Sequence, residues 1–272
     1  MNLALAAMVS LSFSGAVTLF DDANVSCKAS MIEPSLPVEA IEAGYTAEIF
    51  REDFCELDLA RDRGAAHRWY NGLWYNRPSP DHLISVKDGV LTLRTGSEEK
   101  GATIATYSPK AQEGGALFGY GYFEAAMRWT PDPDNWAAFW LFSSEHASGR
   151  DDNRWCEIDI YENYGPKVFV GTAHDWDDYV SSRNRNHYHH LPEPIDSTQW
   201  NRFGLLREPG RLTWFLNGEP LFSAESSAVC NWQKLFLILS AQRHRGDAEQ
   251  DLMVDWVRVY GAPEPGVEAS GR

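Results

Sequence analysis

The sequence predicts an all-β fold, a sandwich of two antiparallel sheets, and three observations support this prediction. Short segments rich in β-branched and aromatic residues follow one another along most of the chain. Turn residues separate them, and Asp88-Gly89 and Asn217-Gly218 have the composition of two-residue hairpin turns. No long stretch repeats its apolar residues with the period of 3.6 that an amphipathic helix requires. Together these features are typical of a β-sandwich.

The predicted strands follow one another within a single domain, since 272 residues are too few for two ordinary domains with linkers. Residues 21–45 are acidic, contain prolines and lack periodicity, so we expect a leader there and a folded domain over residues 46–262. Residues 263–272 are expected to form a loose tail. The segments with the length of one strand or one hairpin are 86–94, 121–129, 136–142, 157–161, 167–174, 203–207, 211–222, 235–241 and 252–260.

The chain begins with an uncharged apolar run over residues 1–20 that has small residues near its end. This run predicts a signal peptide, and therefore a secreted or periplasmic protein, although it is also long enough to remain as an uncleaved membrane anchor. Four cysteines, which could pair in three ways after export, lack the CxxC spacing of a zinc site. They are Cys27, Cys55, Cys156 and Cys230.

Charge and aromatic content narrow the choice of partner. With 24 Lys+Arg against 39 Asp+Glu, the formal net charge is 24 − 39 = −15, which would repel a phosphate backbone or an anionic lipid surface. We therefore expect no nucleic-acid partner. The 11 Trp, 11 Tyr and 13 Phe fill a core first, but flat aromatic rings also stack on sugars.

The segment from Trp155 to Glu162 carries the candidate chemistry. Strand alternation places Glu157 and Asp159 on one face, whereas Glu162, five residues after Glu157, has the wrong parity. An extra residue near Ile160 or Tyr161, forming a β-bulge, would return Glu162 to the face of the other two carboxylates. We therefore predict a bulge at this point.

Three acids on one face of a sheet repel one another and are costly to desolvate, which favours a functional explanation over a structural one. A pair of carboxyls suits retaining glycoside cleavage, in which one attacks the anomeric carbon and the other protonates the leaving oxygen. Glu157 and Glu162 would take these roles, and Asp159 would assist them. The alternative is that the alternating acids are simply the solvated face of a sheet.

The context of this motif resembles glycoside hydrolase family 16, over residues from about Thr46 to Tyr260. The matching segments, in order, are 49–54, 88–93, 120–127, 136–140, the ExDxxE motif at 157–162, His174 and 254–260. The resemblance implies a β-jelly-roll with a concave substrate cleft. It also implies an endo-acting, retaining hydrolase with Glu157 as nucleophile, Asp159 as helper and Glu162 as acid/base.

The bulged motif resembles the laminarinase, agarase and carrageenase branches of that family. We expect a polysaccharide substrate, with β-1,3-glucan leading and a galactan, as in agarases, porphyranases and carrageenases, as the alternative. Arg150, Arg154, Arg183 and Arg185 would bind an anionic galactan if they faced the cleft. Two further readings remain open, a non-catalytic carbohydrate-binding sandwich and a transglycosylase that uses the same residues.

The resemblance also suggests residues that contact the substrate. Trp136 matches the cleft tryptophan of the family, and Trp140 shares its face by alternation. His174 ends the predicted strand 167–174, which follows the motif, at the place where the family has a histidine. Trp176, two residues later, would point to the same face if the strand continued. We expect all four side chains at the site and a monomeric protein.

Catalysis of this kind needs no cofactor, but the resemblance implies one structural metal. Many members hold a calcium ion through a backbone carbonyl that matches Gly89 and a carboxylate that matches Asp255. The cluster His187-Tyr-His-His190 could bind a metal as well. A run of histidines without partnering carboxylates is more often polar surface.

Overall fold

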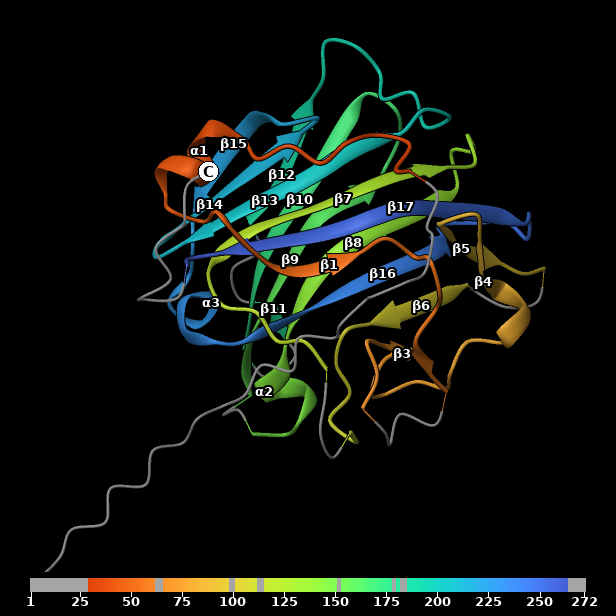
Figure 1. Cartoon of the computed structure of the whole chain (residues 1–272), viewed down its shortest axis with the longest axis horizontal. Helices are drawn as coiled ribbons and strands as arrows, with labels where there is room; N and C mark the ends of the chain where they lie inside the picture. The colour runs from red at the N-terminus through yellow and green to blue at the C-terminus, as the bar shows by residue number, and fades with distance from the viewer. Residues whose placement is uncertain are drawn as a thin grey trace, which may run out of the picture.

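The computed structural model describes residues 29–61, 66–97, 101–111, 115–150, 153–177, 180–181 and 185–263. Two sheets pack face to face, antiparallel except for the pair β2–β3, and the strands of one run in front of the strands of the other (Figure 1). The predicted signal peptide, Cys27 and most of the predicted tail lie outside the described residues. In the part of the chain that the structure describes, no helix is long and apolar enough to cross a membrane.

The first sheet has eight strands and forms the face nearest the viewer in Figure 1. In spatial order they are β15 (Glu219–Glu225), β14 (Arg211–Leu216), β13 (Asn201–Glu208), β7 (Gly121–Trp129), β17 (Gln250–Gly261), β5 (Val90–Thr95) and β4 (Ile84–Lys87), with β1 (Ala47–Glu52) also paired to β17. Both predicted hairpin turns occur in this sheet. Asp88, Gly89, Asn217 and Gly218 all have positive φ angles, as the Asn-Gly and Asp-Gly hairpin turn requires.

The second sheet has nine strands and carries the motif from Trp155 to Glu162. Its order is β11 (Val180–Ser181), β10 (Val168–Asp177), β9 (Arg154–Asn163), β8 (Asn135–Ser143), β16 (Leu235–Arg243), β6 (Ala102–Ala105), β3 (Trp69–Asn71) and β2 (Leu59–Ala60), with β12 (Arg185–His190) also paired to β10. The described residues also form four short helices: α1 (Val38–Glu42), which precedes β1, and η1 (Asp81–Leu83), α2 (Ser144–Ala147) and α3 (Ala228–Trp232), which lie between strands.

The main core lies between the two sheets and explains the alternation seen in the sequence. Phe139 and Leu141 of β8, together with Ile158 of β9, pack there against Phe123 and Leu205 of the first sheet. Burying a side chain of this size is worth about 1.5–3 kcal/mol. The alternate residues of β8, β9 and β10 therefore lie on the opposite face of the second sheet, which we call the site face.

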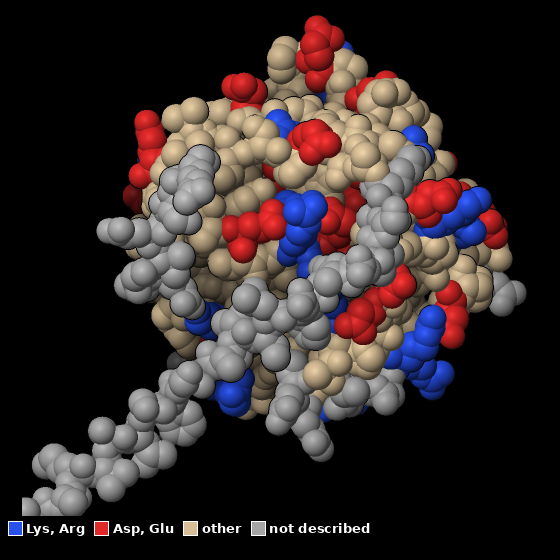
Figure 2. Space-filling view, viewed as in Figure 1, with Lys and Arg blue, Asp and Glu red and all other residues tan. Residues whose placement is uncertain are grey.

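Residues before the expected domain boundary near Thr46 already pack against the first sheet. Ala40 of α1 is fully buried against Tyr122, Leu206 and Phe215 of the first sheet. The Trp256 indole N–H also donates to the backbone oxygen of Ile32 at 2.6 Å. Residues from about 31 onward thus cover the outer face of the first sheet, where acidic and basic side chains lie interspersed (Figure 2). This segment, rich in proline and acidic residues, gains its order from contacts with the sheet.

Candidate active site

A β-bulge in β9 brings the three carboxylates to the site face, as the sequence predicts. Trp140 of β8 pairs with Asp159, and its neighbour Phe139 pairs with Tyr161, so Ile160 is the extra residue. The same shift occurs against β10. Ile160 and Tyr161 are both fully buried in the core between the sheets. Burying two consecutive apolar side chains reverses the parity and turns Glu162 to the site face.

The bulge is braced from the first sheet by Trp214 of β14. Its indole N–H donates to the backbone oxygen of Asp159 at 2.9 Å. Gly171, on β10 opposite the bulge, makes room for this ring, since a Cβ there would lie 2.4 Å from Trp214 Nε1. The position therefore needs glycine for a close approach.

Each of the two glutamates accepts a hydrogen bond from a tryptophan placed diagonally on a neighbouring strand. Glu157 pairs in register with His174, and the next residue on that face, Trp176, donates its indole N–H to Glu157 Oε2 at 2.9 Å. On the other side, Glu162 pairs with Ala138, and Trp136 donates to Glu162 Oε1 at 2.8 Å. Diagonal partners lie within reach of long side chains. The two indoles thus fix the orientation of both glutamates.

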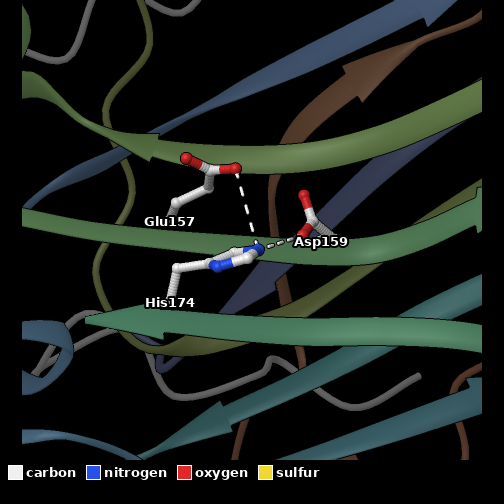
Figure 3. Close-up of side chains that lie close together, drawn as sticks. All are labelled: Glu157, Asp159 and His174. Atoms are coloured by element: carbon white, nitrogen blue, oxygen red, sulfur yellow. Dashed lines mark hydrogen bonds and ion pairs between the residues drawn. The ribbon is translucent and has the colours of Figure 1, made fainter. Parts of the chain in front are cut away.

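His174 connects the remaining acid to the first glutamate. Its Nε2 lies 3.0 Å from Asp159 Oδ2 and 3.9 Å from Glu157 Oε1. Figure 3 shows the three side chains pointing toward one another from adjacent strands. An imidazole N–H or imidazolium in this place favours the ionised forms of both acids.

Burial raises the pKa of all three carboxyl groups. Burial and the charge of Asp159 raise the pKa of Glu157 to about 7, against the opposing effects of His174 and the Trp176 N–H. Burial and the charge of Glu162 raise the pKa of Asp159 to about 6. Burial also raises the pKa of Glu162, although the Trp136 N–H lowers it. Near neutral pH the three groups therefore share protons rather than all being ionised.

The carboxylates open into a cavity of about 220 Å³. Trp136 and His174 line it, as predicted, together with Tyr164, Tyr188, Val170 and Thr172. Trp176 reaches the site through its bond to Glu157. Trp140 lies on the same face but donates to Ser240 Oγ at 3.0 Å and is not part of the cavity lining.

Three aromatic residues at the Glu162 side were not predicted from the sequence. Tyr164 and Tyr188 are exposed side chains of the cavity lining, with ring centroids 6.1 Å apart. His244 stacks on Trp136 at 4.9 Å and 12°, and its Nε2 lies 2.9 Å from the backbone oxygen of Asn163. Alternation along β12 could have indicated Tyr188. His244 follows β16 in a loop, where no pattern points to it.

The disulfide left open by the sequence joins Cys156 to Cys230. Cys156 immediately precedes Glu157, and Cys230 lies in α3. The bond closes a loop with a sequence separation of 74 residues and attaches α3 to the strand that carries the acids. It thus stabilises the second sheet beside the site.

The predicted metal positions differ in how well they fit a cation. Asp255 Oδ2 accepts the backbone N–H groups of Met31 at 2.7 Å and Ile32 at 3.4 Å, and its side chain is buried. Calcium requires six to eight oxygen ligands, and Oδ2 of Asp255 already accepts two N–H groups, so the calcium site with Gly89 stays a prediction. In the histidine cluster, His189 stacks on Phe222.

One group of side chains in the described part of the chain does have metal-ligand spacing. Glu157, Asp159 and His174 can each offer an atom, and these atoms all lie within 4.8 Å of one another. A cation there would have to replace the bond between His174 and Asp159.

Two of the arginines considered for an anionic substrate are engaged elsewhere. Arg154 forms an ion pair with Asp175 at 3.2 Å, and both alternate with residues of the site face. Arg150 donates to Ser148 Oγ at 3.4 Å. Arg183 and the side chain of Arg185 lie outside the described part of the structure.

Comparison with known proteins agrees with this architecture. The solved structures that resemble the chain include the catalytic domain of an endo-1,3-beta-glucanase (laminarinase) from Thermotoga petrophila, with a TM-score of 0.62 and 18% identity over 79% of this chain and 97% of that one. A GlcNAcα1-4Gal releasing endo-β-galactosidase from Clostridium perfringens has a TM-score of 0.64 and 16% identity over 84% and 65%. Porphyranase B from Zobellia galactanivorans has a TM-score of 0.55 and 14% identity over 68% and 80%.

These identities show a shared fold. No curated protein sequence matches the chain. The sequence profile of the glycosyl hydrolases family 16, however, matches residues 74–256, which include the strands from β4 to β16, the bulge and all three acids. The predicted jelly-roll sandwich is thereby confirmed. The protein belongs to the glycosyl hydrolases family 16.

Proposed function

We propose that the protein is a retaining endo-β-glycanase that acts by double displacement. The observation that carries this proposal is the bulge in β9, which costs backbone regularity and places three mutually repelling carboxyls in one cavity. Such an arrangement opposes stability, so its benefit lies in chemistry. Glycoside cleavage uses an ionised and a protonated carboxyl side by side.

In the first step a Glu157 oxygen attacks the anomeric carbon, forming an ester bond as the glycosidic C–O bond breaks. Glu162 gives its proton to the leaving oxygen. In the second step water attacks the same carbon, Glu162 accepts the proton of this water, and the ester to Glu157 breaks. All atoms and protons balance, and both carboxyls return to their initial states.

The contacts of His174 support this division of roles. Its Nε2 lies beside Asp159 and Glu157, and it favours their ionised forms. Among the described contacts, Glu162 has the neutral indole of Trp136 as its hydrogen-bond donor. On these contacts we assign the transferred proton to Glu162, while Trp176 and His174 lower the pKa of Glu157, which burial and Asp159 raise to about 7.

The lining of the cavity favours a neutral polymer. Its described residues are aromatic, acidic, apolar or hydroxyl-bearing, with no lysine or arginine among them. A sulfated or carboxylated sugar would find no lysine or arginine as counter-charge among these described residues. We therefore propose β-1,3-glucan as the substrate, with galactan as the alternative, since relatives of similar fold include a porphyranase and an endo-β-galactosidase.

We also propose that the enzyme acts after export, because a disulfide such as Cys156–Cys230 persists in oxidising compartments. The apolar run at residues 1–20 is consistent with this route.

Reducing-end release from laminarin, lichenan, agarose, porphyran and κ-carrageenan tests the activity. Cleavage of one polymer, lost in Glu157→Ala, would support hydrolysis and identify the substrate class. Proton NMR of the first product formed would test retention through its anomeric signal. A protein that binds a polymer but releases no ends would instead be a carbohydrate-binding sandwich.

A further inference from the structure

Four nearly parallel rings form a stack that ends beside Glu157. Trp176, the donor to Glu157, lies 5.3 Å and 16° from His174 along its own strand. It also lies 5.9 Å and 17° from Trp155, its partner in register on β9. Trp155 in turn stacks on His146 of α2 at 3.7 Å and 21°.

The segment that supplies His146 and Trp155 is the charged stretch of residues 142–155, to which the proposed chemistry gives no role. Trp155 is almost fully buried and belongs to a second apolar cluster, separate from the core between the sheets. Phe142, Phe236 and Ala147 share that cluster with it.

Helix α2 is held in place by contacts that do not involve the ring of His146. The hydroxyl of Ser143 caps the helix by accepting the backbone N–H of His146 at 3.2 Å. Glu145 Oε1 accepts the backbone N–H of Lys234 at 3.3 Å, which attaches α2 to the start of β16. The His146 ring is therefore presented to Trp155 by a fixed backbone.

We propose that His146 and Trp155 are positioning residues for Glu157 and act through Trp176. This inference rests on the proposed role of Glu157 as nucleophile. The indole of Trp176 can hold the Glu157 carboxylate in one orientation only while its own ring is held, and the two neighbouring rings restrict it. Preorganising a nucleophile in this way lowers the barrier without touching the substrate.

His146 is the better position for a test, because it is only half buried, whereas truncating Trp155 would open a cavity in the apolar cluster. His146→Ala removes the ring, and His146→Phe keeps a ring of similar size without the imidazole nitrogens. His82→Ala is the control, because His82 is an exposed histidine of η1, just before β4 of the first sheet.

For the polymer that the enzyme cleaves, His146→Ala is expected to lower kcat by about 3- to 10-fold and to leave KM within about 2-fold, the range expected for losing the stacked contact with Trp155. The ring also has edge contacts with Trp74 and Phe142. His146→Phe should restore kcat to within about 2-fold of the unmodified enzyme. An unchanged kcat in His146→Ala would overturn the proposal. So would a rise in KM alone, which would make His146 a substrate contact, or a His146→Phe variant as impaired as His146→Ala.

A second measurement needs no activity and separates this inference from the proposed function. In ¹⁵N-labelled protein, the Trp176 indole N–H signal, assigned by its loss in Trp176→Phe, should shift as Glu157 ionises. We expect this signal to broaden or move in His146→Ala and to stay unchanged in His146→Phe and His82→Ala. If no polymer is cleaved, this result alone decides the inference, and an unaltered signal in His146→Ala refutes it.

Discussion

Replacing Glu157 with glutamine is expected to stabilise the protein at alkaline pH. Burial and Asp159 raise the pKa of Glu157 from 4.5 to about 7, so the folded state disfavours its ionised form. The stability associated with the protonated carboxyl is present below about pH 4.5 and is lost as the pH rises through about 7. Glutamine keeps the shape and an oxygen for the Trp176 N–H, but it never ionises.

The size of the effect follows from the shift. About 2.5 pKa units at 1.36 kcal/mol per unit give about 3 kcal/mol as an upper limit. Because Glu157 and Asp159 share the repulsion, we take about 2 kcal/mol as the expected gain. For a protein of this size that corresponds to a rise in Tm of about 4–8 °C at pH 8.

Thermal unfolding followed by circular dichroism at pH 4.5 and pH 8 measures this difference. Glu157→Gln should unfold at a higher temperature than the unmodified protein at pH 8 and at the same temperature at pH 4.5. Glu219→Gln, at an exposed position of β15, is the control. If Glu157→Gln and the unmodified protein unfold together at pH 8, then Glu157 is not held in a costly ionised state and the reasoning fails.

Four further outcomes are expected. The pH profile of kcat/KM should have its acid limb between about pH 6 and 7, rather than near 4.5, because Glu157 must ionise; a limb near 4.5 would contradict its raised pKa. Trp136→Phe keeps a ring but loses the N–H to Glu162, so kcat should fall by about 10-fold with the fold intact, as judged by circular dichroism. Gly171→Ala would place a Cβ against Trp214, and we expect a loss of about 2 kcal/mol or more in urea unfolding together with reduced activity. Cys156→Ser should lower the free energy of unfolding by about 2–4 kcal/mol under oxidising conditions, and a reductant should remove that difference.

The pairing of Trp136 with His244 changes the role expected of this tryptophan. The sequence suggested Trp136 chiefly as a platform for a sugar ring. In the structure His244 stacks on Trp136, and the Trp136 indole N–H donates to Glu162. Trp136 therefore positions the acid as well as lining the cavity. Tyr164 and Tyr188, which are exposed on the same lining, are further aromatic surfaces for a sugar.

The sequence by itself determined the class of fold and the position of the acids. Alternation and turn dipeptides predicted the strands, and the hairpins at Asp88-Gly89 and Asn217-Gly218 formed as expected. The parity of Glu162 predicted the bulge, because strand periodicity leaves only an inserted residue as a remedy. These features are local, so a single chain segment contains the information.

Only the tertiary structure decided which side chains hold those acids. The indoles of Trp136 and Trp176 reach the glutamates diagonally across strands, and the register between strands sets those pairings. His244, the ring stack from His146 and the brace from Trp214 come from loops, a short helix and the other sheet. The order of residues 31–45 and the choice of Cys230 as partner of Cys156 have the same origin. Contacts between segments far apart in the chain depend on tertiary packing, so they cannot be predicted from a local sequence pattern.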